Sequence, residues 1–462
     1  MTRWPTLALI AAWATLTVLA GCSSPPVIVS DVRPGRAAAV PLKGAAGPLS
    51  ASQSKAVLDR LARGGQPSEI FDRHLAREEA FAGSPLTAGN RVRLLRDGPA
   101  TYQAMIDAIG AARDHVNLET YILEDDEVGQ RFAQALLAKR REGVQVNLIH
   151  DSAGTIGTPA AFFDRLKAGG VSVLEFHPLN PALTRKEWEL NRRDHRKLLI
   201  VDGSTAFLGG INISSVYSGG SFRPGSRARG DLGPLWRDTH LQLEGPVVAE
   251  LQRLFFASWD SQRGPPLPAS NYFPPPRTAG REVVRAIGSS PDETFSQFYA
   301  TLLSAIASAE TSIRLTNAYF VPDPQLVEAL EAAVRRGVEV TLILPSKTDW
   351  GLVFHAGRSH YARLLRAGVK IHERRGAILH AKTALIDGVW STVGSTNLDW
   401  RSFLHNYELD AVVLGADFGG QMQAMFEADL AASEAITLED WRRRPVDLWL
   451  KEWFSRLWAY WL

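Results

Sequence analysis

DHRKLLIVDG, residues 194–203, recurs later in the chain as LHAKTALIDG, residues 379–388. Both stretches fit the pattern His-x-Lys-x-x-x-x-Asp-Gly, and each is followed some residues later by Gly-(Gly/Ser)-x-Asn. Alternate residues of a strand point the same way, so each histidine shares a face with its lysine. The apolar run after each lysine is typical of a buried strand. We therefore expect two strand ends, each presenting an imidazole beside an ammonium group.

The sequence around the two stretches is also duplicated. In the first copy we expect strands at 92–95, 116–122, 144–149 and 171–176, and helices at 102–112, 128–141 and 163–168. The second copy repeats this order, with strands at 283–286, 312–320, 338–344 and 369–372 and helices at 298–309, 326–336 and 361–367. Several of these helices are followed by glycine, a common helix end. Strands that alternate with helices predict an α/β fold with two tandem domains, each a mixed sheet flanked by helices.

Composition divides the rest of the chain. Two Pro-dense runs separate the copies and predict a linker, because proline continues neither a helix nor a central strand. The predicted segments are a signal peptide (1–21), a tether with an N-terminal helical segment (22–89), the first domain (90–263), the linker (264–280), the second domain (281–435) and an aromatic C-terminal helix (436–462).

The N-terminus resembles a bacterial lipoprotein signal. A positive residue, Arg3, precedes an apolar run that ends in Leu19-Ala20-Gly21 and Cys22. In such signals the leader is removed and the cysteine carries the lipid. A transmembrane anchor is the alternative, although the run is short for a span of about 20 residues. The resemblance implies an anchored protein of the bacterial cell envelope facing the periplasm, and Ser23 after the cysteine favours the outer membrane.

Composition also excludes some classes of function. The chain has 462 residues, a net charge of +2 and a single cysteine. A near-balanced charge gives no support to a whole-protein nucleic-acid binder, so no nucleic-acid partner is expected. One cysteine excludes an internal disulfide framework and a cysteine-based zinc site.

The two strand ends suit a phosphodiester. If they meet, Lys197 and Lys382 neutralise the negative charge that grows on the equatorial phosphate oxygens in the transition state, and Asn212 and Asn397 donate hydrogen bonds to those oxygens. One of the two motif histidines attacks phosphorus while the other protonates the leaving oxygen, which predicts a covalent phosphohistidine. Because the lysines supply the positive charge, we expect no cofactor and no metal ion.

Over residues 90–435 the chain resembles the phospholipase D superfamily, whose paired motifs match His195, Lys197, Asp202 and His380, Lys382, Asp387. Within it, the phrases YILEDD (121–126), WRDTH (236–240) and GSTNLDWRS (394–402) are similar to bacterial cardiolipin synthases. The resemblance implies two phospholipase D-like domains that share one active site at their interface. It also implies phosphatidyl transfer between phospholipids, with phosphatidylglycerol as substrate. A lipid hydrolase, a nuclease and a non-catalytic lipid-binding lipoprotein are the alternatives, and the oligomeric state stays open.

The resemblance assigns further residues. Asp238 and Glu408 occupy the positions of acidic residues that orient the motif histidines, and His195 matches the usual nucleophile. Gly210 stands where the second copy has Ser395, so a hydroxyl that could bind phosphate is missing from the first half. We expect the motif residues Asp202 and Asp387 to bond the turn before glycine rather than to carry protons.

Two surface features have two interpretations each. Basic residues near the motifs predict either an electropositive mouth or a solvated loop: Arg185, Lys186, Arg192, Arg193, Arg196, Arg374 and Arg375. Aromatic residues near the C-terminus predict either a helix at a membrane interface or a helix docked on the body: Trp449, Trp453, Phe454, Trp458, Tyr460 and Trp461.

Overall fold

The computed structural model describes residues 40–63, 75, 83–184, 187–219 and 235–462. The predicted signal peptide, Cys22, Arg185 and Lys186 lie outside the described residues. The described part of the N-terminal segment forms β1 (Leu42–Gly44), β2 (Gly47–Pro48) and α2 (Ala51–Arg63). No helix among the described residues combines the length and the apolar character needed to cross a membrane.

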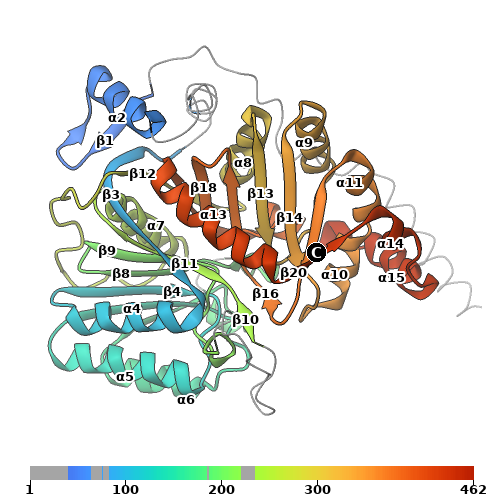
Figure 1. Cartoon of the computed structure of the whole chain (residues 1–462). Helices are drawn as coiled ribbons and strands as arrows, with labels where there is room; N and C mark the ends of the chain where they lie inside the picture. Colours follow the sequence, from blue (N-terminus) through green and yellow to red (C-terminus); the bar gives the residue numbers. More distant parts are fainter. Residues whose placement is uncertain (1–39, 64–74, 76–82, 185–186, 220–234) are drawn as a thin grey trace, which may run out of the picture.

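The first half contains one mixed sheet in the order β6–β5–β4–β8–β9–β11–β3 (Figure 1). Strands β4, β5 and β6 are parallel, and the other neighbours are antiparallel. The bounds are β3 Leu86–Arg96, β4 His115–Thr120, β5 Gln145–Asp151, β6 Ser172–Phe176, β8 Lys197–Val201, β9 Thr205–Gly209 and β11 Thr239–Glu244. The helices of this half are α4 Asp97–Ala111, α5 Glu127–Arg141, α6 Ala160–Ala168 and α7 Val247–Ser261.

The second half repeats this order as β15–β14–β13–β17–β18–β19–β12, with β20 added beside β15. The bounds are β12 Glu282–Ser289, β13 Ser312–Asn317, β14 Glu339–Pro345, β15 Lys370–Arg374, β17 Lys382–Ile386, β18 Trp390–Gly394, β19 Asn406–Leu414 and β20 Ser433–Ile436. Its helices are α8 Gln297–Ser308, α9 Pro324–Arg335, α10 Gly351–Arg358, α11 Tyr361–Ala367, α12 Trp400–Leu404 and α13 Ala416–Ala431. The predicted duplication is therefore confirmed strand by strand.

Strand β3 joins the two sheets, which the sequence did not predict. Its beginning pairs with β12 of the second half, for example Thr87 with Val284, and its end pairs with β11 of the first half, for example Leu94 with Leu241. The two halves thus share one continuous sheet. Helices α7 and α13 pack in a central core that contains residues of both halves, while separate cores lie on the outer faces.

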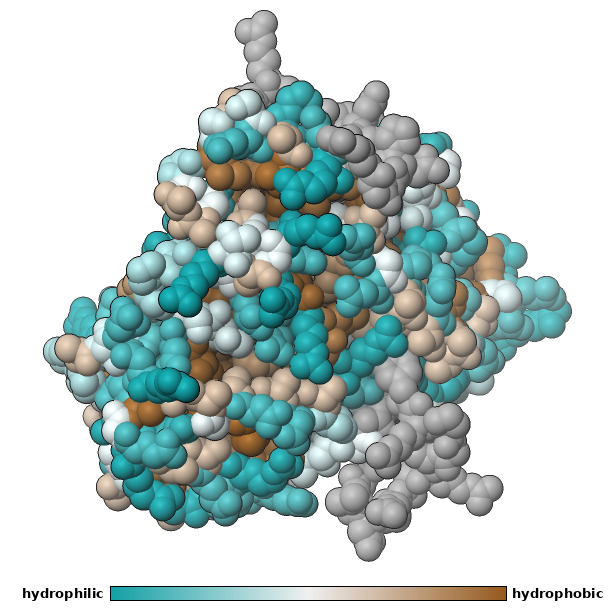
Figure 2. Space-filling view, turned by 60° about the vertical axis from the view of Figure 1, so that its left-hand side comes forward, coloured by the Kyte–Doolittle hydropathy of each residue, from teal (hydrophilic) through white to brown (hydrophobic). Residues whose placement is uncertain are grey.

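The C-terminal segment differs from the predicted single helix. It contains α14 (Leu438–Arg442), α15 (Val446–Arg456) and the 3-10 turn η3 (Ala459–Trp461). Pro445 immediately precedes α15. Proline is tolerated at a helix start, because N–H groups there have no partner within the helix, and it cannot continue the helix that comes before it. In Figure 1 α14 and α15 lie beside α10 and α11 at the outer edge of the second half. Figure 2 shows a face of the molecule that mixes hydrophilic residues with small apolar patches.

Candidate active site

The first motif histidine is held by the second half of the chain. The short strand β7 (Arg193–Asp194) pairs in parallel with the start of β19. His195, the next residue, donates its backbone N–H to the carbonyl oxygen of Tyr407 over 2.9 Å. Its ring Nδ1 lies 3.0 and 2.9 Å from the two carboxylate oxygens of Glu408.

The second motif histidine is held by the first half in the same way. The short strand β10 (Trp236–Arg237) pairs in parallel with β16 (Ile378–Leu379). His380, which follows β16, donates its backbone N–H to the carbonyl oxygen of Arg237 over 2.8 Å. Its Nδ1 lies 2.7 Å from Oδ2 of Asp238. Each imidazole therefore has its Nδ1 against a carboxylate of the opposite half, which leaves Nε2 for chemistry.

Both histidines line one cavity of about 200 Å³, together with Asn212 and Asn397. The structure thus brings the two distant motifs together, as the chemistry of a single phosphorus atom requires. Asn212 donates from Nδ2 to the hydroxyl of Tyr217 over 3.1 Å, and that hydroxyl lies 3.3 Å from Nδ1 of His380. Oδ1 of Asn397 is buried without a hydrogen-bond partner among the described residues.

The motif lysines lie behind the imidazoles, deep in the site. Each ammonium donates to the carbonyl oxygen of its own motif histidine, and Nζ of Lys382 also lies 3.0 Å from Nδ1 of His380. Nζ of Lys197 stands 5.2 Å from the centre of the Tyr121 ring. Burial lowers the pKa of Lys197 to about 7 and that of Lys382 to about 8. Both ammonium groups therefore begin to lose their charge near neutral pH.

The two histidine–carboxylate pairs differ in electrostatics. Burial lowers the pKa of His195 well below its usual value and raises the pKa of Glu408 to about 7. Burial would also raise the pKa of Asp238, but the charge of His380 and the hydrogen bond to it outweigh burial, so this pKa lies below its usual value. Asp238 thus stays ionised beside His380, whereas the His195–Glu408 pair tends toward two neutral groups.

Comparisons with known proteins agree with this geometry. The family model for the cardiolipin synthase, PLD-like domain matches residues 105–217 and 302–430, one stretch in each half. Cardiolipin synthase A of Pseudomonas aeruginosa is 38% identical over 368 residues, which cover 79% of this chain and 71% of that protein. A cardiolipin synthase of Geobacillus kaustophilus is 33% identical over 81% of this chain and 72% of its own length.

The chain belongs to the cardiolipin synthase family. It is a phospholipase D-type phosphatidyltransferase, and its substrates are phospholipids. Among solved structures, the phosphatidylserine synthase of Haemophilus influenzae superposes with a TM-score of 0.62 at 13% identity, covering 83% of this chain and 99% of that chain. At that identity the likeness supports the fold alone.

Two predicted substrate-binding residues of this cardiolipin synthase-family enzyme lie elsewhere than expected. The Ser395 hydroxyl donates to Oε2 of Glu408 over 2.5 Å and accepts from the backbone N–H of Leu409 over 2.9 Å. At Gly210 an added Cβ would lie 2.2 Å from Oδ1 of Asp238. Neither residue lines the cavity. Both positions make room for, or bond to, a histidine-orienting carboxylate, and their contact with phosphate stays a prediction.

The motif aspartates lie at the far ends of their strands. Asp202 accepts hydrogen bonds from the backbone N–H groups of residues 113–115, and Asp387 accepts them from residues 310–312. Both have positive φ, 51° and 50°, at the turn before glycine. They hold the preceding helix-to-strand connection against the motif strand, whereas the sequence predicted that they bond the turn before glycine. Neither lines the cavity.

The sequence missed one ion-pair network that supports the site. Asp429 of α13 accepts from Arg237 at Nε (3.0 Å) and Nη2 (2.8 Å) and from Nε of Arg374 (3.0 Å). Arg237 also donates to the carbonyl oxygen of Asp238. All these side chains are buried. The network ties the strand that carries Asp238 to the second half.

Of the basic residues near the motifs, Arg193 lines the active-site cavity, and the choice between an electropositive mouth and a solvated loop stays a prediction. Arg193, Arg196 and Arg374 are buried and bond internally. Arg192 pairs with Asp292, and Arg375 pairs with Glu434. The five described arginines therefore all have bonding partners within the protein.

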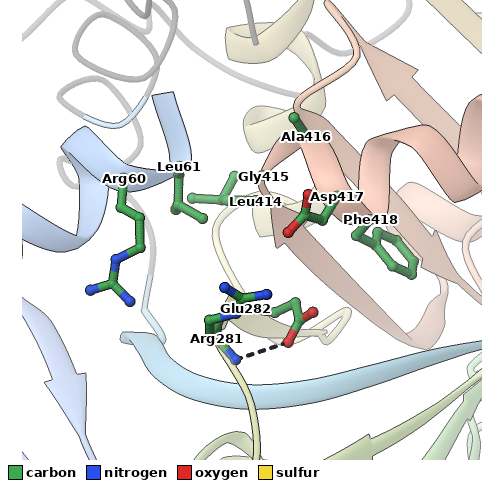
Figure 3. A pocket seen from close by; sticks show the side chains of 9 residues that line it. All are labelled: Arg60, Leu61, Arg281, Glu282, Leu414, Gly415, Ala416, Asp417 and Phe418. Carbon is green, nitrogen blue, oxygen red and sulfur yellow. Dashed lines mark hydrogen bonds between the residues drawn. The ribbon is translucent and has the colours of Figure 1, made fainter. Parts of the chain in front are cut away.

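A second cavity of about 200 Å³ lies between α2 and the junction of β19 with α13 (Figure 3). Its charged side chains are Arg60, Arg281, Glu282 and Asp417, and no histidine or lysine lines it among the residues that the structure describes. It carries none of the motif groups and is not the site of phosphatidyl transfer.

Proposed function

We propose that this enzyme transfers a phosphatidyl group from one phosphatidylglycerol molecule to another, forming cardiolipin and releasing glycerol. The observation that carries the proposal is the crossed arrangement of the site. Two imidazoles face one cavity, and each is oriented by a carboxylate of the other half. Membership of the cardiolipin synthase family supports the lipid substrate.

The reaction proceeds in two displacements. In the first, Nε2 of one motif histidine attacks phosphorus while the other histidine protonates the departing glycerol oxygen. The product is a phosphatidyl-histidine. In the second, the unprotonated partner takes a proton from the hydroxyl of a second phosphatidylglycerol, whose oxygen attacks phosphorus and frees the first histidine. Lys197 and Lys382 stabilise the charge on the phosphoryl oxygens in both steps, and Asn212 and Asn397 bind those oxygens.

We assign the nucleophile to His195 and the general acid to His380. The low pKa of His195 keeps its imidazole neutral, as a nucleophile must be. Burial and the charge of Lys382 also lower the pKa of His380, but the ionised Asp238 opposes them, so this pKa is lowered less than that of His195 and His380 is the better proton carrier. This difference between the two pairs supports the assignment that the family resemblance implies.

We further propose that the enzyme works at the periplasmic face of the bacterial cell envelope, anchored by a lipid on Cys22. The signal-like sequence before Cys22 supports the anchor, and Ser23 favours the outer membrane. The anchor keeps the enzyme at the surface that contains its substrate.

Product analysis tests the proposed reaction. Wild-type enzyme is incubated with vesicles of phosphatidylglycerol, and the lipid and glycerol products are separated and quantified. We expect one glycerol released for each cardiolipin formed. Accumulation of phosphatidic acid in place of cardiolipin would identify a hydrolase, and no lipid turnover with cleavage of plasmid DNA would identify a nuclease.

The pH dependence follows from the two lysines. Each is cationic below its pKa, so the free enzyme keeps both charges at low pH and loses them as pH rises through about 7 for Lys197 and about 8 for Lys382. We expect kcat/KM to fall on the alkaline side over this range. In Lys382→Arg the guanidinium stays charged, so the upper part of the alkaline fall should shift to higher pH while the maximal rate drops. An unchanged profile in this variant would assign the fall to other groups.

A further inference from the structure

Helix α15 is attached to the protein by its polar side. It packs against α10, and its buried residues are Glu452 and Ser455. A carboxylate oxygen of Glu452 lies 2.9 Å from the guanidinium of Arg444, and the other lies 3.8 Å from that of Arg358. A surface helix of a globular protein usually buries its apolar side instead. The orientation of α15 is therefore the reverse of the usual one.

The opposite side of α15 exposes large apolar side chains to solvent. Trp453 is 55% exposed and Leu457 is 63% exposed. With helical spacing, these residues form a stripe with the similarly exposed Val446, Trp449, Leu450 and Phe454. Exposed apolar surface of this extent marks an interaction site in a soluble protein. We call these six residues the α15 face.

Helix α15 is connected to the wall of the active-site cavity through α10, whose Val353 lines that cavity. Trp350, which precedes α10 and is itself 47% exposed, lines the cavity, and so does Leu462. Leu462 packs against Val353 and Ala356 of α10, the helix that carries α15. Figure 1 shows α15 beside α10 and the marked chain end at the junction of the two halves.

Exposed apolar residues of the first half lie in loops at the end of the sheet that carries the motif histidine. Thr120 at the end of β4 pairs with Lys197, so the carboxyl ends of the parallel strands lie at the histidine end of β8. Four exposed apolar residues come from loops after β5 and β6: Ile156, Leu183, Trp188 and Leu190. Phe273, also exposed, lies one residue from Pro274, which contacts Gly203 at the opposite end of β8.

The size of the cavity indicates what covers this surface. At about 200 Å³ it is smaller than the ~300–1,000 Å³ typical of sites that enclose a whole small molecule. It accommodates a phosphate and a head group, so the two acyl chains of a phospholipid stay outside. Acyl chains outside the cavity need an apolar environment, which a bilayer supplies. Indole rings are enriched where a protein meets the bilayer interface, because they combine an apolar body with an N–H donor.

We propose that the α15 face is a docking surface for a phospholipid bilayer, and that docking places the cavity mouth against the head-group layer. The proposal rests on the proposed function, because it takes the substrate to be a bilayer phospholipid. The lipid on Cys22 would tether the chain, whereas the α15 face would orient the active site. Phospholipids then enter by a short displacement of the head group, without leaving the membrane.

The test compares two physical forms of one substrate. Full-length enzyme with Trp449→Ser, Leu450→Ser and Trp453→Ser is assayed on phosphatidylglycerol in vesicles and on dihexanoyl phosphatidylglycerol below its aggregation concentration. We expect the vesicle rate to fall at least tenfold and the rate on the monomeric lipid to stay within twofold of wild type. The matched control is Phe273→Ser, which removes an equally exposed aromatic ring at the far end of the sheet and should leave both rates unchanged. Tryptophan quenching by brominated lipids should weaken in the triple variant only.

Other outcomes overturn the proposal. Unchanged rates on both substrates would show that the surface does not dock. An equal fall on both, or a wild-type dimer in analytical ultracentrifugation that the triple variant lacks, would assign the surface to folding or to a second copy of the chain. Failure of the proposed function looks different: wild-type enzyme would then make no cardiolipin from either form of phosphatidylglycerol, whatever its binding to vesicles.

Discussion

Alanine at either His195 or His380 is expected to lower kcat for cardiolipin formation by roughly 10³–10⁴-fold or more, because the two act as one unit. Without His195 no covalent intermediate forms. Without His380 the departing glycerol oxygen leaves unprotonated. Both side chains line the same cavity, and no other histidine of the described part of the chain lines it. The measurement is single-turnover formation of cardiolipin from labelled phosphatidylglycerol.

A p-nitrophenyl phosphodiester separates the two histidines. Its leaving group departs without a proton, so His380→Ala should still release one equivalent of nitrophenol in a burst and retain acid-labile phosphate on the protein. His195→Ala should show no burst. The reverse result would exchange the two roles.

Asp202→Ala is the matched control, because this motif residue bonds backbone N–H groups at the other end of β8. The Asp202→Ala variant should lose about 1–3 kcal/mol of free energy of unfolding and keep most of its activity per folded molecule.

Asp429→Ala is expected to lower the free energy of unfolding by about 3–5 kcal/mol, the usual cost of removing one partner from a buried ion pair. Both Arg237 and Arg374 would lose their shared carboxylate inside the protein. Because Arg237 also bonds the backbone of Asp238, activity should fall as well, through a misplaced His380. Urea denaturation measures the stability, and kcat per folded molecule measures the activity.

Glu434→Ala is the comparison for this variant. Glu434 pairs with Arg375 at the surface, where an ion pair contributes about 0–1 kcal/mol. Its loss should leave stability and activity near wild type. A similar small effect in Asp429→Ala would mean that the buried network does not support the site.

Much of the fold could be predicted because apolar periodicity and helix-ending glycines are local signals, and they occur twice. The duplicated order of strands and helices emerged on this basis. The joining of the two sheets by β3 could not be predicted, because the partner of each residue in Leu86–Arg96 depends on contacts with strands more than 100 residues away. The local sequence pattern also did not predict α10, because this short helix (351–358) contains glycine at two positions.

Those residues of the site that belong to the repeated motif could be predicted from the sequence. His195, His380 and their lysines could be found because two copies at matching places exclude coincidence. Which carboxylate bonds which histidine was not predictable, since it follows from strands that cross between the halves. The contact of Ser395 with Glu408 was missed for a related reason: a motif names a residue but not the direction of its hydroxyl.

The crossing of β7 and β10 into the opposite half has an evolutionary consequence. A two-fold rotation axis generates reciprocal contacts of this kind, because both partners use the same surface for the contact. A shorter ancestral gene encoding one repeat could complete its catalytic pairs only by homodimerisation. Fusion of two such genes makes assembly independent of protein concentration and lets each repeat mutate separately. The two pairs are indeed not identical: one has an aspartate beside glycine and the other a glutamate beside serine.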